Sequence, residues 1–219
     1  MTSAMRDAHA SPRPVPRIAV GESPDVLAAI YDTDINVAIW RRADPAGDGV
    51  VPTDVARRSL TIEAGVPADA VDDCLAQLLP EDLQSLRADI ARLAAMFACL
   101  FDVAYLGLRL KTLDKPMCPR FHVDRVTCRL LTTYAGAGTE YLVNEDVDRS
   151  RLGRPVADRD RLPLLRDDAV IHRMPAGAVA LCKGEAWPGN EGAGFVHRSP
   201  DPAGSPRLVL SIDGLGSER

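Results

Sequence analysis

The second half of the chain alternates apolar and polar residues with a period of two. Leu106, Leu108 and Leu110 occupy alternate positions, which is the pattern of a strand with one buried face. Further strand-like runs follow, separated by glycine, proline and aspartate: 121–134, 139–143, 169–173, 178–182, 193–197 and 207–213. Many short strands with turn residues between them predict a double-sheet jelly roll, the cupin-like double-stranded β-helix barrel, over residues 103–219.

A helical pattern precedes these strands. Over residues 66–102 apolar side chains recur at intervals of three and four, and Pro67 and Pro80 stand where helices begin. The apolar stripe of the second helix consists of Leu83, Leu86, Ile90, Leu93, Phe97 and Leu100. We expect this helix to pack against the sheet as a support, so the predicted fold class is α+β, a jelly roll with an N-terminal helical extension.

The chain of 219 residues suits a single domain. Residues 1–17 are rich in Pro, Ser and Ala without an apolar period, which predicts a disordered lead. Residues 18–219 then form the domain, with 18–102 as mainly helical support and 103–219 as the jelly-roll core. Within the support, Ile35 to Trp40 is apolar enough for a strand or a docking segment.

Charge and composition narrow the classes of partner. The net charge is −5 and the pI is about 5.4, which argues against a nucleic-acid binder because such proteins present a basic face. No apolar run approaches the roughly 18 residues that span a bilayer, and the N-terminus lacks the apolar centre of a secretory signal. Five scattered cysteines without a CxxC pair favour a reduced, cytoplasmic protein.

Candidate chemistry begins at the segment Cys118-Pro-Arg-Phe-His122-Val-Asp124. On a strand, residues i and i+2 share a face, so His122 and Asp124 can hold one metal ion together. If that strand continues unbroken, Thr132 and Tyr134 lie on the same inward face. Asp124 could instead form an ion pair with Arg125 or Arg129.

A third ligand and a cationic group follow downstream. His197 lies on a later strand-like run, and Arg207 begins another one ten residues further on. Two histidines and one carboxylate leave coordination positions open, which favours iron(II) chemistry with oxygen and a chelating co-substrate. An arginine offers a planar fork that suits a carboxylate.

In these residues the sequence resembles the 2-oxoglutarate/iron(II) dioxygenase superfamily, whose pattern is HxD, a distal His, and an Arg or Lys about ten residues later. The resemblance covers roughly residues 104–213. It implies that His122, Asp124 and His197 ligate iron and that Arg207 binds the far carboxylate of 2-oxoglutarate. Thr132 or Tyr134 would add a hydroxyl to that carboxylate. The implied activity is hydroxylation or demethylation of a small molecule or a protein side chain.

A closer likeness rests on two long phrases, CPRFHVDRVTCRLLTTYAGAGTEYL and GAVALCKGEAWPGNEGAGFVHRSP. Both are similar to the bacterial domain of unknown function 1826 family, and the likeness extends back to about Trp40. This family adds no activity of its own to the expectation.

Two departures leave an alternative open. Val209 stands two residues after Arg207, where some oxygenases have a serine. Cys118 could join the ligand set and close it as a four-coordinate zinc site. The protein would then be a non-catalytic metal binder acting in metal handling. A buried, inert thiol is the other interpretation of Cys118, and a degenerate fold without metal is a third possibility for the whole protein.

Two loops carry weaker signals. Trp187 and Asn190 precede His197 and would form either a substrate rim over the metal pocket or a tight turn in which Trp187 caps the core. The Asp- and Arg-rich segment 144–165 is either a solvated loop or a functional lid.

Overall fold

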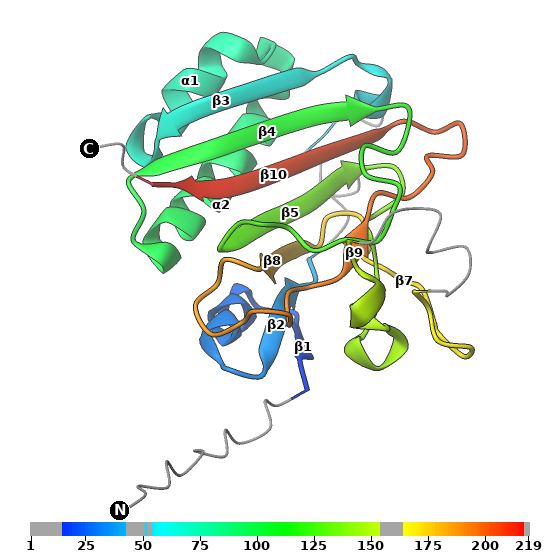
Figure 1. Cartoon of the computed structure of the whole chain (residues 1–219). Helices are drawn as coiled ribbons and strands as arrows, with labels where there is room; N and C mark the ends of the chain where they lie inside the picture. The colour runs from blue at the N-terminus through cyan, green and yellow to red at the C-terminus, as the bar shows by residue number, and fades with distance from the viewer. Residues whose placement is uncertain (1–14, 43–50, 52–53, 154–163, 217–219) are drawn as a thin grey trace, which may run out of the picture.

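The computed structural model describes residues 15–42, 51, 54–153 and 164–216. Two β-sheets form its framework (Figure 1). The major sheet has seven strands in the order β1-β2-β8-β5-β10-β4-β3, and the minor sheet has the order β7-β6-β9. In chain order the strands are β1 (Arg17–Gly21), β2 (Ile35–Trp40), β3 (Thr61–Pro67), β4 (Tyr105–Leu113), β5 (Cys128–Ala135), β6 (Glu140–Tyr141), β7 (His172–Arg173), β8 (Val179–Lys183), β9 (His197–Arg198) and β10 (Arg207–Leu215). The two sheets and the accompanying helices confirm the predicted α+β jelly-roll class.

Two α-helices cover one face of the major sheet (Figure 1). They are α1 (Val71–Leu78) and α2 (Gln84–Phe101), each preceded by a short 3-10 turn that directly follows Pro67 or Pro80, as predicted. The apolar stripe of α2 is buried in the largest core cluster. The 3-10 helices are η1 (Pro24–Tyr31), η2 (Val55–Arg57), η3 (Ala68–Ala70), η4 (Glu81–Leu83), η5 (Asn144–Asp146) and η6 (Arg149–Arg151). Among the described residues, no helix has both the length and the apolar character that crossing a bilayer requires.

The N-terminal part contributes more than helical support, which corrects the sequence-based division. It supplies β1, β2 and β3 to the major sheet. All six residues of β2 are buried, because this strand lies between β1 and β8 and is covered on both faces. The predicted lead falls largely outside the described residues, and its last residue, Arg17, already begins β1.

The two faces of β5 carry different residues. Cys128, Leu130 and Tyr134 belong to the core cluster that contains α2, whereas Leu131 packs with the cluster on the opposite side. Thr132 pairs with Val179 and Leu210, which lie in the α2 cluster as well. The even-numbered residues of β5 therefore face the helices, and the odd-numbered residues face the minor sheet.

A buried charged network ties α2 to the sheet. The carboxylate of Asp89 accepts hydrogen bonds from Arg42 Nη1 at 2.6 Å, Arg92 Nη2 at 2.8 Å and Tyr134 Oη at 2.7 Å. Burial by itself would raise the pKa of Asp89, but these hydrogen bonds outweigh it and hold the pKa below its usual value. Asp89 is thus a charged group whose removal leaves buried partners unsatisfied.

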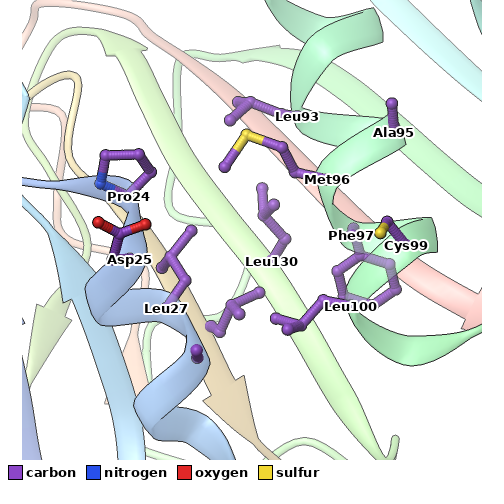
Figure 2. Close-up of a pocket in the computed structure, with 12 residues that line it drawn as sticks. Pro24, Asp25, Leu27, Leu93, Ala95, Met96, Phe97, Cys99, Leu100 and Leu130 are labelled. Atoms are coloured by element: carbon purple, nitrogen blue, oxygen red, sulfur yellow. The ribbon is translucent and has the colours of Figure 1, made fainter.

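The helix face also contains an apolar cavity of about 540 Å³ between η1 and α2 (Figure 2). Leu130 and Leu181 lie at its sheet side, and Asp25 is its one charged lining residue among those described. Since Leu130 faces α2, this cavity lies across the major sheet from the residues that face the minor sheet.

We predict that Asp89→Ala lowers the free energy of unfolding by about 3–5 kcal/mol, since it leaves a buried guanidinium and a buried phenol without their acceptor. Urea unfolding followed by far-UV circular dichroism measures this. The matched control is Asp72→Ala, which removes an exposed carboxylate 3.1 Å from Arg87 Nε and should cost less than about 1 kcal/mol. Equal effects of the two substitutions would contradict a stabilising role for the Asp89 network.

Candidate metal centre

A backbone bridge brings the two predicted histidine ligands together. His122 N donates to His197 O, and His197 N donates to His122 O, both at 3.0 Å. This antiparallel pair places the two imidazole rings 4.6 Å apart between centroids. His197 is the first residue of β9 and also pairs with Tyr141 of β6, so its backbone is fixed on both sides.

Asp124 reaches the same point from the loop that follows His122. Its carbonyl oxygen accepts a hydrogen bond from Glu185 N at 2.9 Å. A Cβ atom on Gly184 would lie 2.7 Å from that oxygen and 2.0 Å from the carbonyl oxygen of Val126. Glycine is therefore required at position 184 for the loop to pack this closely against the end of β8.

The ligand atoms of His122, Asp124 and His197 all lie within 4.8 Å of one another. Each imidazole Nδ1 faces a backbone carbonyl oxygen, that of Arg120 at 2.9 Å for His122 and that of Phe195 at 3.2 Å for His197. Because a carbonyl oxygen can only accept, each Nδ1 carries the hydrogen, and Nε2 of the neutral ring presents a lone pair.

Those lone pairs converge on the carboxylate. His122 Nε2 is 3.5 Å from Asp124 Oδ1, and His197 Nε2 is 3.4 Å from Oδ2. Ligand atoms at about 2.1 Å from one metal ion, at right angles, stand roughly 3 Å apart. When both rings are neutral, the two Nε2 atoms and the two carboxylate oxygens are all electron-rich and need a cation between them. A proton on Nε2 supplies it in a hydrogen bond to Asp124, and a divalent metal can take the place of the proton.

The charge of Asp124 also suits a ligand. Burial by itself would raise the pKa of this carboxyl, but His122, His197 and Arg129 hold it far below its usual range. The hydrogen bond with Asp124 in turn raises the pKa of His122, against the opposing effect of burial. Asp124 is therefore ionised at neutral pH, as a metal ligand must be. The ion pair considered from the sequence also forms, with Arg129 Nη1 2.9 Å from Asp124 Oδ2.

Cys118 does not join this cluster. Its side chain is exposed, and among the described residues the group with mutually close ligand atoms consists of the two histidines and the aspartate. The backbone of Cys118 nevertheless lies near the centre, because its carbonyl oxygen accepts from Ser199 N at 2.9 Å. The closed zinc set that the sequence allowed therefore does not form among the described residues.

Arg207 lines the same cavity as His122 and His197. Its residue is 1% exposed, and among the described residues its hydrogen-bond partners are all neutral: the carbonyl oxygen of Ala137 and the hydroxyls of Ser199, Thr133 and Thr139, at 2.7, 3.4 and 3.3 Å for the hydroxyls. Burial lowers the pKa of Arg207 to about 10, with a smaller contribution from Arg173. The guanidinium is thus a buried cation at neutral pH, set in hydroxyl groups.

Comparison with known protein families shows to which family the chain belongs. The family model described as "Protein of unknown function (DUF1826)" matches residues 21–213. The chain belongs to this family. No curated protein matches the sequence. The match extends over the helical part and the sheets alike, in line with the likeness inferred from the two sequence phrases.

Among solved structures, the fold is similar to two plant enzymes. The rice dioxygenase for auxin oxidation is 15% identical, with a TM-score of 0.51, and the alignment covers 93% of this chain and 84% of that one. The corresponding Arabidopsis thaliana protein, solved as a complex with 2-oxoglutarate, is 10% identical, with a TM-score of 0.50 and 92% coverage of both chains. The protein therefore has the jelly-roll fold of 2-oxoglutarate-dependent dioxygenases, together with a His-Asp-His cluster that can hold a metal.

Thr132 and Tyr134, which the sequence predicted to add a hydroxyl to the co-substrate carboxylate, lie on the helix face of the sheet, away from Arg207. Tyr134 donates to Asp89 on that face, and the buried Thr132 hydroxyl has no hydrogen-bond partner among the described residues. Thr133 contacts Arg207 instead. The cause is the start of β5 at Cys128. The residues before it form a loop, so the alternation counted from His122 does not continue into the strand.

The sequence interpretation did not name Thr139 and Ser199, which line the cavity, or Thr133, which contacts Arg207, and it named Arg129 only as a possible ion-pair partner of Asp124. Ser199 follows His197 by two residues, so the spacing that linked His122 to Asp124 also pointed to it. The other three depend on strand register, for which the sequence alone gives no signal.

The two predicted rim residues lie elsewhere, which corrects that assignment. Trp187 packs against the helix-face core, with ring centroids 5.6 Å from Tyr31 and 6.1 Å from Phe101. Lys183 Nζ lies 4.7 Å from the Trp187 ring centroid. Asn190 is buried in its own turn and donates to Gly184 O at 3.3 Å. Trp187 therefore caps the core, the other interpretation that the sequence allowed.

The described parts of segment 144–165 pack against the two segments that carry His122 and His197. Leu152 and Leu165 pack on a small core that includes Phe121 and Val196, the residues just before His122 and His197. Arg149 Nη1 donates to Gly194 O at 2.9 Å. Residues 154–163 lie outside the described part, and a lid role for them stays a prediction.

We predict that His197→Ala abolishes binding of one equivalent of Co²⁺ or Zn²⁺, because the two ligands that remain, His122 and Asp124, are too few to hold the ion. Isothermal titration of metal-free protein measures this. His172→Ala is the matched control, since that ring stacks on Tyr141 at 5.3 Å and lies outside the ligand cluster; it should bind metal like the parent. Metal binding that survives His197→Ala would rule out the cluster.

Proposed function

We propose that the protein is an iron(II)- and 2-oxoglutarate-dependent oxygenase that acts on a small molecule or a protein side chain. The observation that carries this proposal is a single cavity of about 100 Å³ lined by His122 and His197 at one place and by Arg207 at another. A co-substrate that chelates the metal and carries a second, distal carboxylate needs two things. It needs free coordination positions on the metal, and it needs a cationic side chain at some distance from the metal.

In this proposal His122, Asp124 and His197 hold the iron. Three protein ligands leave half of an octahedral shell for other molecules. When bound, iron supplies the oxygen-activating chemistry of this enzyme class. The chain's own contribution is to fix the ligands, orient the co-substrate and keep other reactants out of the cavity.

Arg207 would bind the distal carboxylate of 2-oxoglutarate. A buried cation with only neutral partners is costly, and a carboxylate partner offsets that cost. The hydroxyls of Thr133, Thr139 and Ser199 already hold the guanidinium in place, so little side-chain freedom is lost on binding. Val209, at the position where some oxygenases have a serine, lines the same cavity.

The related fold supports the same co-substrate. The Arabidopsis thaliana dioxygenase with the similar fold was solved with 2-oxoglutarate. The alternative, a closed zinc site for metal handling, depended on Cys118 as a fourth ligand, and that thiol lies outside the ligand cluster. The geometry therefore favours an open site over a closed one.

Anaerobic addition of Fe²⁺ and then 2-oxoglutarate to metal-free protein should produce a weak visible charge-transfer band that requires both additions. The band reports chelation of the co-substrate to an iron with adjacent open positions. His197→Ala should give no band, and His172→Ala should give the parent's band. Tight metal uptake by the parent with no band on adding 2-oxoglutarate would overturn the oxygenase proposal and favour the metal-handling alternative.

Arg207→Met should weaken 2-oxoglutarate binding by roughly 100-fold, because breaking a buried charged pair costs about 2–5 kcal/mol, while Co²⁺ affinity changes by less than about threefold. The intensity of the band against 2-oxoglutarate concentration provides the first affinity and calorimetry the second. Arg173→Ala is the control, because Arg173 pairs with Glu140 and does not line the cavity.

Unchanged 2-oxoglutarate affinity in Arg207→Met would remove Arg207 from the co-substrate site. If this variant fails to fold, Arg207→Lys keeps a buried cation but loses the fork, and the same comparison of the two affinities applies to it.

A further inference from the structure

Arg129 joins the candidate metal ligand to the centre of the major sheet. It lies on the odd-numbered face of β5 and lines the cavity with His122 and Arg207. Its Nη1 is 2.9 Å from Asp124 Oδ2. We propose that Arg129 is a positioning residue of the metal centre, which occupies Oδ2 and leaves Asp124 a single oxygen, Oδ1, for the metal. This inference rests on the proposed function, because it concerns how many positions remain open at the iron.

The Arg129 guanidinium is held in a fixed orientation. Its Nε and Nη2 donate to Oδ1 and Oδ2 of Asp213, both at 2.7 Å, which is the bidentate arrangement of an arginine–carboxylate pair. Asp213 faces Arg129 directly across the β5–β10 ladder. With Nε and Nη2 bound to Asp213, the remaining nitrogen, Nη1, lies 2.9 Å from Asp124 Oδ2 as an ion pair without hydrogen-bond geometry.

Asp213 is itself fixed. It is 4% exposed, and its Oδ2 also accepts from Arg109 Nη1 at 2.8 Å. Arg109 lies on β4, on the far side of β10 from β5. The carboxylates and guanidiniums thus alternate across three neighbouring strands, from Arg109 through Asp213 and Arg129 to Asp124.

Oδ2 of Asp124 has little else to contact. The atom is buried, and apart from the Arg129 ion pair and the approach of His197 it has no hydrogen-bond partner in the described structure. Without the guanidinium, Oδ2 is free to turn toward a metal held by the two imidazoles.

The number of carboxylate oxygens on the metal decides what else can bind. A carboxylate can bind a cation through one oxygen or through both. Two histidines and a bidentate aspartate fill four of six positions, and a chelating co-substrate then fills the last two. With one oxygen bound, a sixth position stays open. Arg129 therefore preserves the vacancy on which the proposed reaction depends.

A purely structural role for Arg129 predicts a different outcome. If Arg129 only stabilises the sheet through Asp213, its loss lowers stability and weakens every ligand alike. If it controls the binding mode of Asp124, its loss removes a positive charge from beside the metal and frees an oxygen, so metal binding does not weaken. The co-substrate, which competes with the freed oxygen, binds more weakly.

The test compares Arg129→Met and Arg129→Lys with Arg109→Ala, which removes the outer arginine but leaves the Arg129–Asp124 contact. Co²⁺ affinity is measured by calorimetry and 2-oxoglutarate affinity by the charge-transfer band of the Fe²⁺ protein. Crystal structures of the Co²⁺-loaded proteins, without co-substrate, show whether one or both oxygens of Asp124 bind the ion. Urea unfolding reports the stability of each variant.

For Arg129→Met we expect equal or tighter Co²⁺ binding, weaker 2-oxoglutarate binding, and both Asp124 oxygens on the ion where the parent has one. Arg129→Lys, which cannot bridge both carboxylates, should change in the same direction by less, and it serves as the folded variant if Arg129→Met is unstable. Arg109→Ala should match the parent in both affinities.

Parallel loss of both affinities in the Arg129 variants, or a single bound Asp124 oxygen in Arg129→Met as in the parent, would overturn the inference. The proposed function fails separately, if the parent protein itself gives no charge-transfer band. In that case the binding mode of Asp124 in the Co²⁺ proteins still decides whether Arg129 sets it.

Discussion

The candidate site depends on one backbone interaction, the antiparallel pair between His122 and His197. His122 lies in a loop before β5, and this pair joins it directly to β9. The two hydrogen bonds of 3.0 Å place both imidazoles on one side of the bridge. Their Nδ1 atoms then donate to nearby carbonyl oxygens, so that the two Nε2 atoms face Asp124. Gly184 and the small core around Phe121 and Val196 hold the two segments together.

The major sheet separates two kinds of buried charge. On the helix face, Asp89 is matched by Arg42 and Arg92, and its role is to join α2 to the sheet. On the other face, Arg129 is matched by Asp124 and Asp213, whereas Arg207 has neutral partners. A buried charge that is paired with opposite charges of the chain itself, such as Asp89, stabilises the fold. A buried cation without a carboxylate partner is ready for an anionic ligand, and this contrast between the faces supports the proposed co-substrate site.

Arg129 links these two aspects of the molecule. Through Asp213 it belongs to the framework of the sheet, and through Asp124 it belongs to the metal centre. The register of β10 against β5 and β4 therefore bears directly on the coordination of the ion. A rigid sheet can hold a ligand carboxylate to one binding mode in a way that a mobile loop cannot.

The sequence by itself determined the fold class, the α2 stripe and the four residues His122, Asp124, His197 and Arg207, because these rest on local spacing and on the order of strands along the chain. It did not determine that β5 begins at Cys128, and a shift of the strand start moves side chains to the other face of a sheet. For that reason Thr132 and Tyr134, predicted to contact the co-substrate carboxylate, lie on the helix face, and Thr133 is the threonine of β5 that contacts Arg207. The sequence likewise left two positions for Trp187, a substrate rim or a cap on the core. The side of the sheet to which a loop folds depends on contacts with distant residues such as Tyr31 and Phe101. The partners of Arg207 and the bridge from Asp213 through Arg129 to Asp124 come from strands far apart in the chain, so only their register in the folded sheet decided them.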